Sequence, residues 1–255
     1  MNVAPGHVLW RLSGRFWWLP ALLLLVVPLP ALAQSVSLDL GEGGPGATGK
    51  LVQLTAVITV LLLAPSLLVM LTAFPRIVIV LSLLRSALGT QGTPPNMVLI
   101  GLALFLTYFV MQPVLDQAWT LGLQPLSEGR VPELEGLRRA AAPFHGFMLA
   151  NVRESDLTLF SGLGHVAAPA SPDETSWRVL VPAFLVGELR RAFEMGFLLY
   201  LPFLVIDMVV ASLLMSLGMM MLPPTAISLP FKIIFFVLVD GWRMVSGSLV
   251  QSFGG

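Results

Sequence analysis

An apolar run without any charged residue extends from Leu51 to Phe74. A helix rises 1.5 Å per residue, so a run of this length can cross the hydrocarbon core of a bilayer, which is about 30 Å thick. Only 11% of the whole chain is charged, whereas soluble domains contain roughly 25% charged residues. The sequence therefore predicts a membrane-spanning helix here, and lipid rather than water as the solvent for most of the chain.

Charge and cysteine content exclude several classes of function. The formal net charge is zero, and the basic residues are scattered rather than gathered into a stripe that could neutralise a nucleic-acid backbone. The absence of cysteine excludes disulfides, thiolate metal sites and a cysteine nucleophile. We therefore expect no nucleic-acid partner, and stability that comes from packing and assembly.

Residues 1–33 have the features of a cleavable export signal. Arg11 and Arg15 form a basic lead, Phe16 to Pro30 an apolar run, and Ala31 to Ala33 a small-residue cleavage site. The alternative is a retained first transmembrane helix, but prolines interrupt the run and it is short for a bilayer. We predict that the mature chain begins with a flexible, glycine-rich segment at residues 34–50.

Residues 51–115 are predicted to form a first helical pair. The second span of this pair covers Met97 to Leu115, after a turn rich in glycine and proline. Between the two spans lies a connector that contains Arg76 and Arg85. Cleavage of the signal leaves the new N-terminus outside, so the connector is predicted to be cytoplasmic, as the positive-inside bias prefers.

Residues 116–178 differ in character from the flanking sequence. Thirteen of the twenty-eight charged residues fall here, among several prolines and glycines. We predict a small extracytoplasmic domain with a helix over residues 134–152 that is interrupted at Pro143, followed by a short helix from Glu154 to Phe160.

Hydrophobicity returns in residues 179–255, the predicted second helical pair, but charges interrupt it. Glu188 with Arg191, and Arg190 with Glu194, have the i,i+3 and i,i+4 spacings at which helical residues can pair. The apolar run is predicted to end at Leu222, because two prolines follow it.

The last segment, Phe231 to Phe253, is predicted to be one helix. At 100° per residue, Lys232, Asp240 and Arg243 project from one face of this helix, and the other faces are apolar. That face is expected to meet protein or water.

Three charges in otherwise apolar sequence are predicted to specify subunit contacts: Glu188, Asp207 and Lys232. An unpaired charge in a membrane helix costs roughly 2.5 to 3.5 kcal/mol, so carboxylate-to-ammonium pairing within or between subunits is expected. The pattern does not decide which acid pairs with Lys232. Proton relay is the alternative role, but no chain of further acids or histidines accompanies these residues.

A methionine triplet, Met219, Met220 and Met221, lies between Gly218 and Pro223. Methionine is unbranched and adaptable, so several copies around a narrow opening could close it and still conform to different polypeptides. The alternative is that these residues are ordinary apolar residues of a membrane core. Their place at a break from glycine to proline is one where a loop could point inward, but the residues alone do not decide between the two interpretations.

Three blocks of the sequence resemble the FliP family, whose members build the export gate of the flagellar type III secretion apparatus. The first is residues 72–114, the second is PAFLVGELRRAFEMGF at residues 182–197, and the third is PPTAISLPFKIIFFVLVDGW at residues 223–242. Gly187 stands where the resemblance leads us to expect serine or threonine. Together with the export signal and the polar insert, the blocks and the methionine triplet occur in the family's order, and the resemblance as a whole covers nearly all of the predicted mature chain.

The resemblance implies an all-α fold of polytopic, membrane-associated helical hairpins with a small helical extracytoplasmic domain. It implies five copies of the chain around a channel with FliQ-type and FliR-type partners, next to other basal-body proteins, in the inner membrane at the flagellar basal body. Unfolded export substrates would pass through, the methionine triplet would be the channel gasket, and the extracytoplasmic domain would be periplasmic. Family knowledge also places Phe147 and Phe160 near the channel or subunit contacts. The related SctR family of injectisomes is the alternative branch.

Other functions find less support in the sequence. Asp207 and Asp240 could imitate an aspartyl protease, but Arg243 next to Asp240 favours an ionised pair over a shared proton. His145 and His165 have no second ligand at metal-site spacing, and no phosphate-binding loop is present. We therefore predict no catalytic residues, no cofactor and no metal. An ion-coupled transporter would show internal repeats, which are absent, and a scaffold without a channel cannot be distinguished by sequence.

Overall fold

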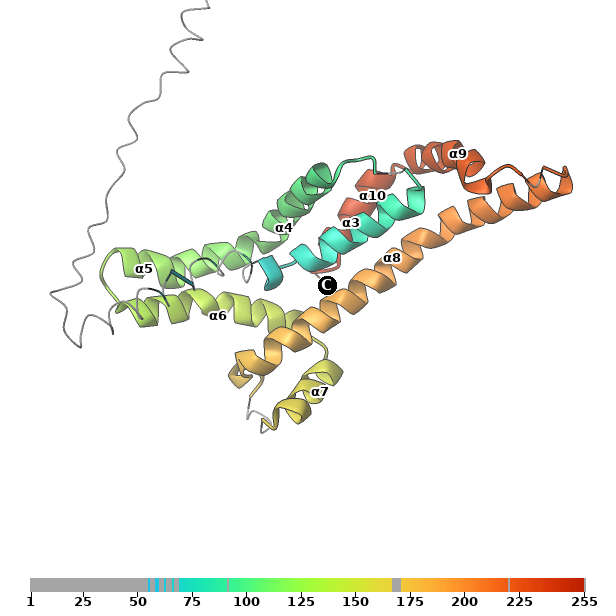
Figure 1. Ribbon diagram of the computed structural model, residues 1–255. Helices are drawn as coiled ribbons and strands as arrows, with labels where there is room; N and C mark the ends of the chain where they lie inside the picture. Colours follow the sequence, from blue (N-terminus) through green and yellow to red (C-terminus); the bar gives the residue numbers. More distant parts are fainter. Residues whose placement is uncertain are drawn as a thin grey trace, which may run out of the picture. The chain divides into compact units, whose positions relative to one another are not determined.

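The computed structural model describes residues 69–90, 92–166, 171–219 and 221–254, together with isolated positions from Thr55 to Ser66. The chain divides into two units, Met1–Ala56 and Val57–Gly255, and the second contains every element discussed below. Among the described residues every element is helical (Figure 1), which confirms the all-α class. The predicted export signal at residues 1–33, the flexible segment at 34–50 and most of the first predicted span lie outside the described residues.

Helix α3 (Phe74–Leu88) is the most enclosed of the described helices. It packs between α4 (Asn96–Ala118) and α8 (Trp177–Ser216), as Figure 1 shows. Its inward side chains, among them Ile77, Leu81 and Leu84, have at most 1% of their surface exposed. The segment with Arg76 and Arg85, predicted to be a connector between two spans, is thus a helix packed inside the protein. The inward apolar side of this helix is covered by protein, and a buried charge partner holds Arg76.

Helix α4 confirms the second predicted span. It follows a turn that begins at Gly89, whose φ of 71° is in the left-handed region, and its helical path continues through a π-helical turn, η1 (Trp119–Leu123), into α5 (Gln124–Ser127). The combined stretch Asn96–Ser127 is long and apolar enough to cross a membrane. Pro113 lies inside α4 without ending it.

The segment after α5 forms two helices, α6 (Glu133–Asn151) and α7 (Glu154–Gly164). The predicted helix from Glu154 is confirmed, but the interruption at Pro143 is wrong, because α6 continues through it. An interior proline removes one backbone hydrogen bond and costs about 3 kcal/mol. Pro143 is buried and α6 packs on α4, η1 and α8, so tertiary contacts outweigh that cost.

Helix α8 is forty residues long and is the second candidate span. It ends at Ser216 rather than at the predicted Leu222, because Gly218 adopts a left-handed φ of 71° and turns the chain. Pro223 and Pro224 do not stop α8 but begin α9 (Pro224–Leu238). A proline fits the first turn of a helix because the amide hydrogen that it lacks would have no partner there.

The predicted single helix from Phe231 to Phe253 is wrong. Asp240 adopts a left-handed φ of 51°, and the chain bends by 63° between α9 and α10 (Gly241–Gln251). Aspartate tolerates this conformation better than most residues, and glycine follows it. Lys232 therefore does not share a helix face with Asp240 and Arg243. The bent pair could form a third, broken span by length and composition.

The helix that holds η1 crosses α6 at very close range, because two small residues meet there. A Cβ added at Gly122 would overlap the backbone of Ala140. Gly146, also on α6, has open space at the same position. Gly122 thus sets the distance between the two helices.

We predict that Gly122→Ala forces η1 and α6 apart and lowers the free energy of unfolding by roughly 1–3 kcal/mol, as overpacking does. Gly146→Ala is the matched control and should raise it by about 0.5–1 kcal/mol, because alanine favours helix. Thermal unfolding followed by circular dichroism in detergent measures both. Equal behaviour of the two variants would contradict the close crossing.

Candidate functional site

Buried charges distinguish this molecule from an ordinary helical bundle. Among the described residues, Arg76, Glu188 and Lys232 are at most 4% exposed, although they lie in apolar surroundings. The side chain of Asp207 is 21% exposed. Burial of a charge is costly unless it is paired and hydrogen-bonded, so the partners of these four side chains determine how the helices must pack.

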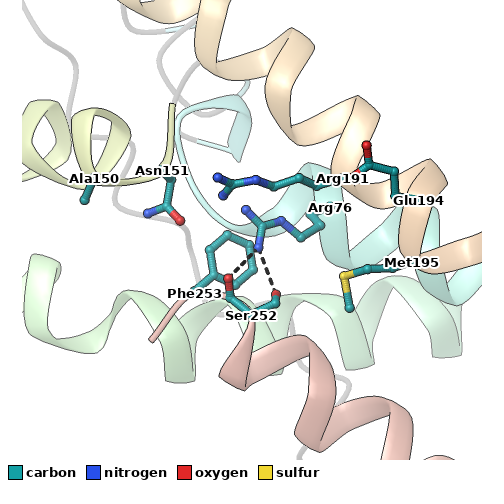
Figure 2. A pocket seen from close by; sticks show the side chains of 8 residues that line it. All are labelled: Arg76, Ala150, Asn151, Arg191, Glu194, Met195, Ser252 and Phe253. Atoms are coloured by element: carbon teal, nitrogen blue, oxygen red, sulfur yellow. Dashed lines mark hydrogen bonds between the residues drawn. The ribbon is translucent and has the colours of Figure 1, made fainter. Parts of the chain in front are cut away.

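Arg76 and Glu188 form the first buried pair. Arg76 Nε donates to Glu188 Oε2 at 2.7 Å, and Nη2 donates to Oε1 at 2.5 Å. The remaining nitrogen, Nη1, donates to the carbonyl oxygen and to Oγ of Ser252 at 2.9 and 2.8 Å (Figure 2). The guanidinium carbon lies 3.6 Å from the centre of the Phe253 ring. This two-bond geometry is the strong form of an arginine-carboxylate contact, and it ties α3, α8 and the segment after α10 together.

The sequence predictions for this region are partly confirmed. Arg190 pairs with Glu194 at 2.9 Å, as its spacing indicates. Glu188 does not pair with Arg191, because the buried guanidinium of Arg76 occupies both of its oxygens. Sequence reasoning treated Arg76 as a topology signal in a connector. The signal for an internal pair was that Arg76 lies in an otherwise apolar stretch, while acidic residues lie in other apolar stretches of the chain.

Asp207 and Lys232 form the second pair. Lys232 Nζ donates to Asp207 Oδ2 at 2.7 Å and to the carbonyl oxygen of Ala87 at 3.0 Å. Ser228 Oγ donates to the other oxygen, Asp207 Oδ1, at 2.5 Å. Because Ala87 is in the last turn of α3, the ammonium also lies at the negative end of that helix. The pair joins α8, α9 and α3, and it shows that Lys232 pairs with Asp207 rather than with Glu188.

The methionine turn joins α8 to α9. Met219 follows the left-handed Gly218 and is 48% exposed, and Met221 is 98% exposed. Met220 lies outside the described residues. Within the described part of the chain, the turn therefore presents one half-covered methionine and one that is almost fully exposed.

The two predicted aromatics lie in different places. Phe147 on α6 packs against Phe184 and stacks on Phe253, and the centre of its ring lies 6.0 Å from the ring centre of each. Because Phe253 contacts Arg76, Phe147 borders the Arg76 centre. Phe160 lies on α7 and is half-buried. The structure does not bring the two together.

The described part of the chain contains no arrangement of side chains that is typical of a catalytic or metal site. No group of three or more histidine or acidic side chains there could hold a metal ion. Both oxygens of Asp207 are occupied by Ser228 and Lys232, so Asp207 is not placed to share a proton with Asp240. A ring nitrogen of His145 lies 2.7 Å from the carbonyl oxygen of Thr175, which is a structural contact.

Comparison with known proteins matches residues 57–249 to the FliP family. The chain belongs to the FliP family. A flagellar biosynthetic protein FliP of Caulobacter vibrioides is 54% identical over 236 residues, which cover 92% of this chain and 88% of that protein. Proteins of the same name from Agrobacterium fabrum and Bacillus subtilis are each 48% identical, over 90% and 82% of this chain and 96% and 95% of theirs.

FliP membership and the long apolar helices together make this a membrane-embedded protein of flagellar biosynthesis. FliP is not a known enzyme family. The similar proteins carry the flagellar name, which favours the flagellar branch over the injectisome branch.

One departure from the expected FliP pattern has a structural counterpart. Asp156 on α7 is the one residue in the described part of the chain with a buried side-chain oxygen, Oδ2, that has no hydrogen-bond partner. A Cβ added at Gly187 on α8 would lie 3.4 Å from that oxygen. A serine or threonine, the residues expected at position 187, would bring a hydroxyl within reach. The glycine of this chain leaves the carboxylate oxygen unpaired.

We predict that Glu188→Gln lowers the free energy of unfolding by roughly 3–5 kcal/mol, because it leaves the buried Arg76 without a counter-charge. Glu135→Gln is the control. Glu135 pairs with Arg139 on α6 but is solvated, and exposed pairs contribute little. Denaturant unfolding in detergent compares the two, and a Glu188→Gln variant as stable as the control would contradict the pairing.

A second prediction concerns Gly187→Ser. The new hydroxyl should donate to Asp156 Oδ2 and add about 0.5–1.5 kcal/mol of stability, besides the gain from removing a helical glycine. Gly187→Ala separates the two contributions, because it removes the glycine without supplying a donor. Serine no more stable than alanine would show that the hydrogen bond does not form.

Proposed function

We propose that this chain is a subunit of the flagellar type III protein export gate. Copies of it, five by the family resemblance, would surround a channel together with FliQ-type and FliR-type subunits. Unfolded export substrates would leave the cytoplasm through this channel during flagellum assembly. The proposal is supported by FliP membership and by the exposed methionine turn between the long apolar helix α8 and the shorter apolar helix α9.

The surface of the chain suits a subunit that is covered by neighbours or lipid. Large apolar side chains are exposed along α4, α8 and α9, including Phe105, Phe197 and Val237 at 77%, 63% and 70%. Soluble monomers rarely expose contiguous apolar patches of this kind. Glu188, Asp207 and Lys232 find their partners inside the chain, so their proposed role in assembly is to fix the helices that carry the contact surfaces.

The gasket role rests on the exposure of the methionine turn. Met221 is almost fully exposed at the end of the α8–α9 hairpin, and the Asp207–Lys232 pair braces the same hairpin from within. Flexible thioether side chains from several copies could meet on the channel axis and seal it. Met219, Met220 and Met221 are the residues that we assign to this seal. Phe147 and Phe160 are proposed only to lie near the channel or subunit contacts.

The location proposed for the chain is the inner membrane at the flagellar basal body. Residues 116–178, which include α6 and α7, would form the periplasmic domain, and other basal-body membrane proteins would lie next to it. The charged character of this segment and the export signal expected before it support that orientation.

We predict that replacing Met219, Met220 and Met221 with alanine leaves helix content and assembly unchanged but makes the membrane leak small solutes, because three flexible side chains no longer fill the opening. Met215→Ala on α8 is the control, since Met215 is 65% exposed but precedes the turn. Membrane conductance in cells that make each variant measures the leak.

Unchanged conductance in the triple variant would refute the gasket. A stalled export substrate provides the complementary test, because it should crosslink to a photoreactive residue at position 221 and not to one at position 215. Failure to crosslink at 221 in assembled complexes would favour a scaffold that lines no passage.

A further inference from the structure

A cavity of about 420 Å³ opens beside the Arg76 centre. Helices α3, α6 and α8 and the segment after α10 line it, and its polar side chains are Arg76, Asn151, Arg191, Glu194 and Ser252 (Figure 2). The gate mechanism proposed above does not use this cavity.

The cavity has a surplus of positive charge. Glu188 is occupied by Arg76, and Glu194 accepts hydrogen bonds from Arg190 at 2.9 Å and from Arg153 at 3.4 Å. Over the described ranges, Arg191 makes no hydrogen bond or ion pair. The charged residues that line the cavity and their ion-pair partners are thus four arginines and two glutamates, and Arg191, although Glu188 and Glu194 lie near it, forms a salt bridge with neither.

Figure 2 shows the guanidinium groups of Arg191 and Arg76 pointing into the same cavity, toward the side chain of Asn151. Asn151 Nδ2 donates one hydrogen to the carbonyl oxygen of Phe147, which leaves its second amide hydrogen for another acceptor. An anion between these groups would relieve the repulsion between the two arginines. It could also accept hydrogen bonds from the guanidinium of Arg191 and from the side-chain amide of Asn151.

The position of the cavity along α8 indicates the kind of anion. Beyond Glu194, residues 195–216 contain Asp207 as their single charge. This stretch is about 33 Å long at 1.5 Å per residue, which matches the hydrocarbon core of a bilayer, about 30 Å thick. The cavity therefore lies at one edge of a stretch that is long enough to span the bilayer, which is where lipid headgroups would lie. Met195 and Phe253 supply apolar lining next to it.

We propose that this cavity binds the phosphate of an anionic phospholipid headgroup, with Arg191 as the principal ligand and Asn151 as a second donor. The planar fork of arginine matches the oxygens of a phosphate, and basic pockets between membrane helices are known to hold such headgroups. A carboxylate from another copy of the chain offers similar oxygens, but the depth of the site favours lipid.

Arg191→Gln tests the proposal in the full-length chain. The protein is placed in nanodiscs of equal parts phosphatidylglycerol and phosphatidylcholine, released in the gas phase, and the lipids that it retains are counted by native mass spectrometry. Wild type should retain phosphatidylglycerol in preference, and Arg191→Gln should retain about tenfold less, as loss of a charge-assisted contact predicts. Arg178→Gln is the control, because Arg178 is an exposed arginine of the same helix, and it should behave as wild type.

Equal retention by Arg191→Gln and Arg178→Gln would overturn the proposal. Protection of the wild type from heat by inorganic phosphate alone, without retained phosphatidylglycerol, would overturn the lipid assignment and indicate a free-anion site. Loss of self-association in Arg191→Gln with unchanged lipid would indicate a carboxylate of another copy. If Arg191→Gln does not fold, Arg191→Lys decides, since it keeps the charge but not the fork and should lose phosphatidylglycerol severalfold. Retention equal to wild type would overturn the proposal.

Discussion

A buried arginine is the constraint on which the rest of this structure depends. Arg76 is 1% exposed, and a guanidinium cannot lose its proton to avoid the cost of burial. Its partners must therefore come to it. Glu188 supplies two oxygens and Ser252 two more, from positions 112 and 176 residues farther along the chain. One side chain thereby brings the beginning, the middle and the end of the described chain to a single point.

Helix α3 carries a charge centre at each end. Arg76 lies in its first turn, and the carbonyl oxygen of Ala87 in its last turn accepts from Lys232. Helix α8 supplies the acid at both centres, Glu188 and Asp207. The two helices are therefore held at two separate positions along their length, and apolar side chains fill the interface between them. The direction of α8 and the placement of the hairpin that follows it result from these two points.

The sequence was sufficient for the class of fold, the span beginning near Met97, the α7 helix and the family. It was insufficient where tertiary contacts decide. The two arginines of α3 led to its interpretation as a connector, although the partner of Arg76 lies 112 residues farther along the chain. Pro143 looked like a break because its cost is local, whereas the packing of α6 is not. The bend at Asp240 had a signal, the Asp-Gly pair that is typical of turns. The pairing of Asp207 with Lys232 needed three-dimensional information, because the sequence alone allowed either Glu188 or Asp207 as the partner of Lys232.

The length of α8 beyond its last anchored residue has a mechanical consequence. From Glu188 to Asp207 the helix is held over about 28 Å, and from Asp207 to Ser216 it extends about 14 Å further. Among the described helices, α9 is the one that accompanies this final part. If the hairpin tilted about Asp207, the displacement would be largest at its tip, and the two charge centres would stay in place. The Asp207–Lys232 pair is thus the last buried charge contact before the methionine turn.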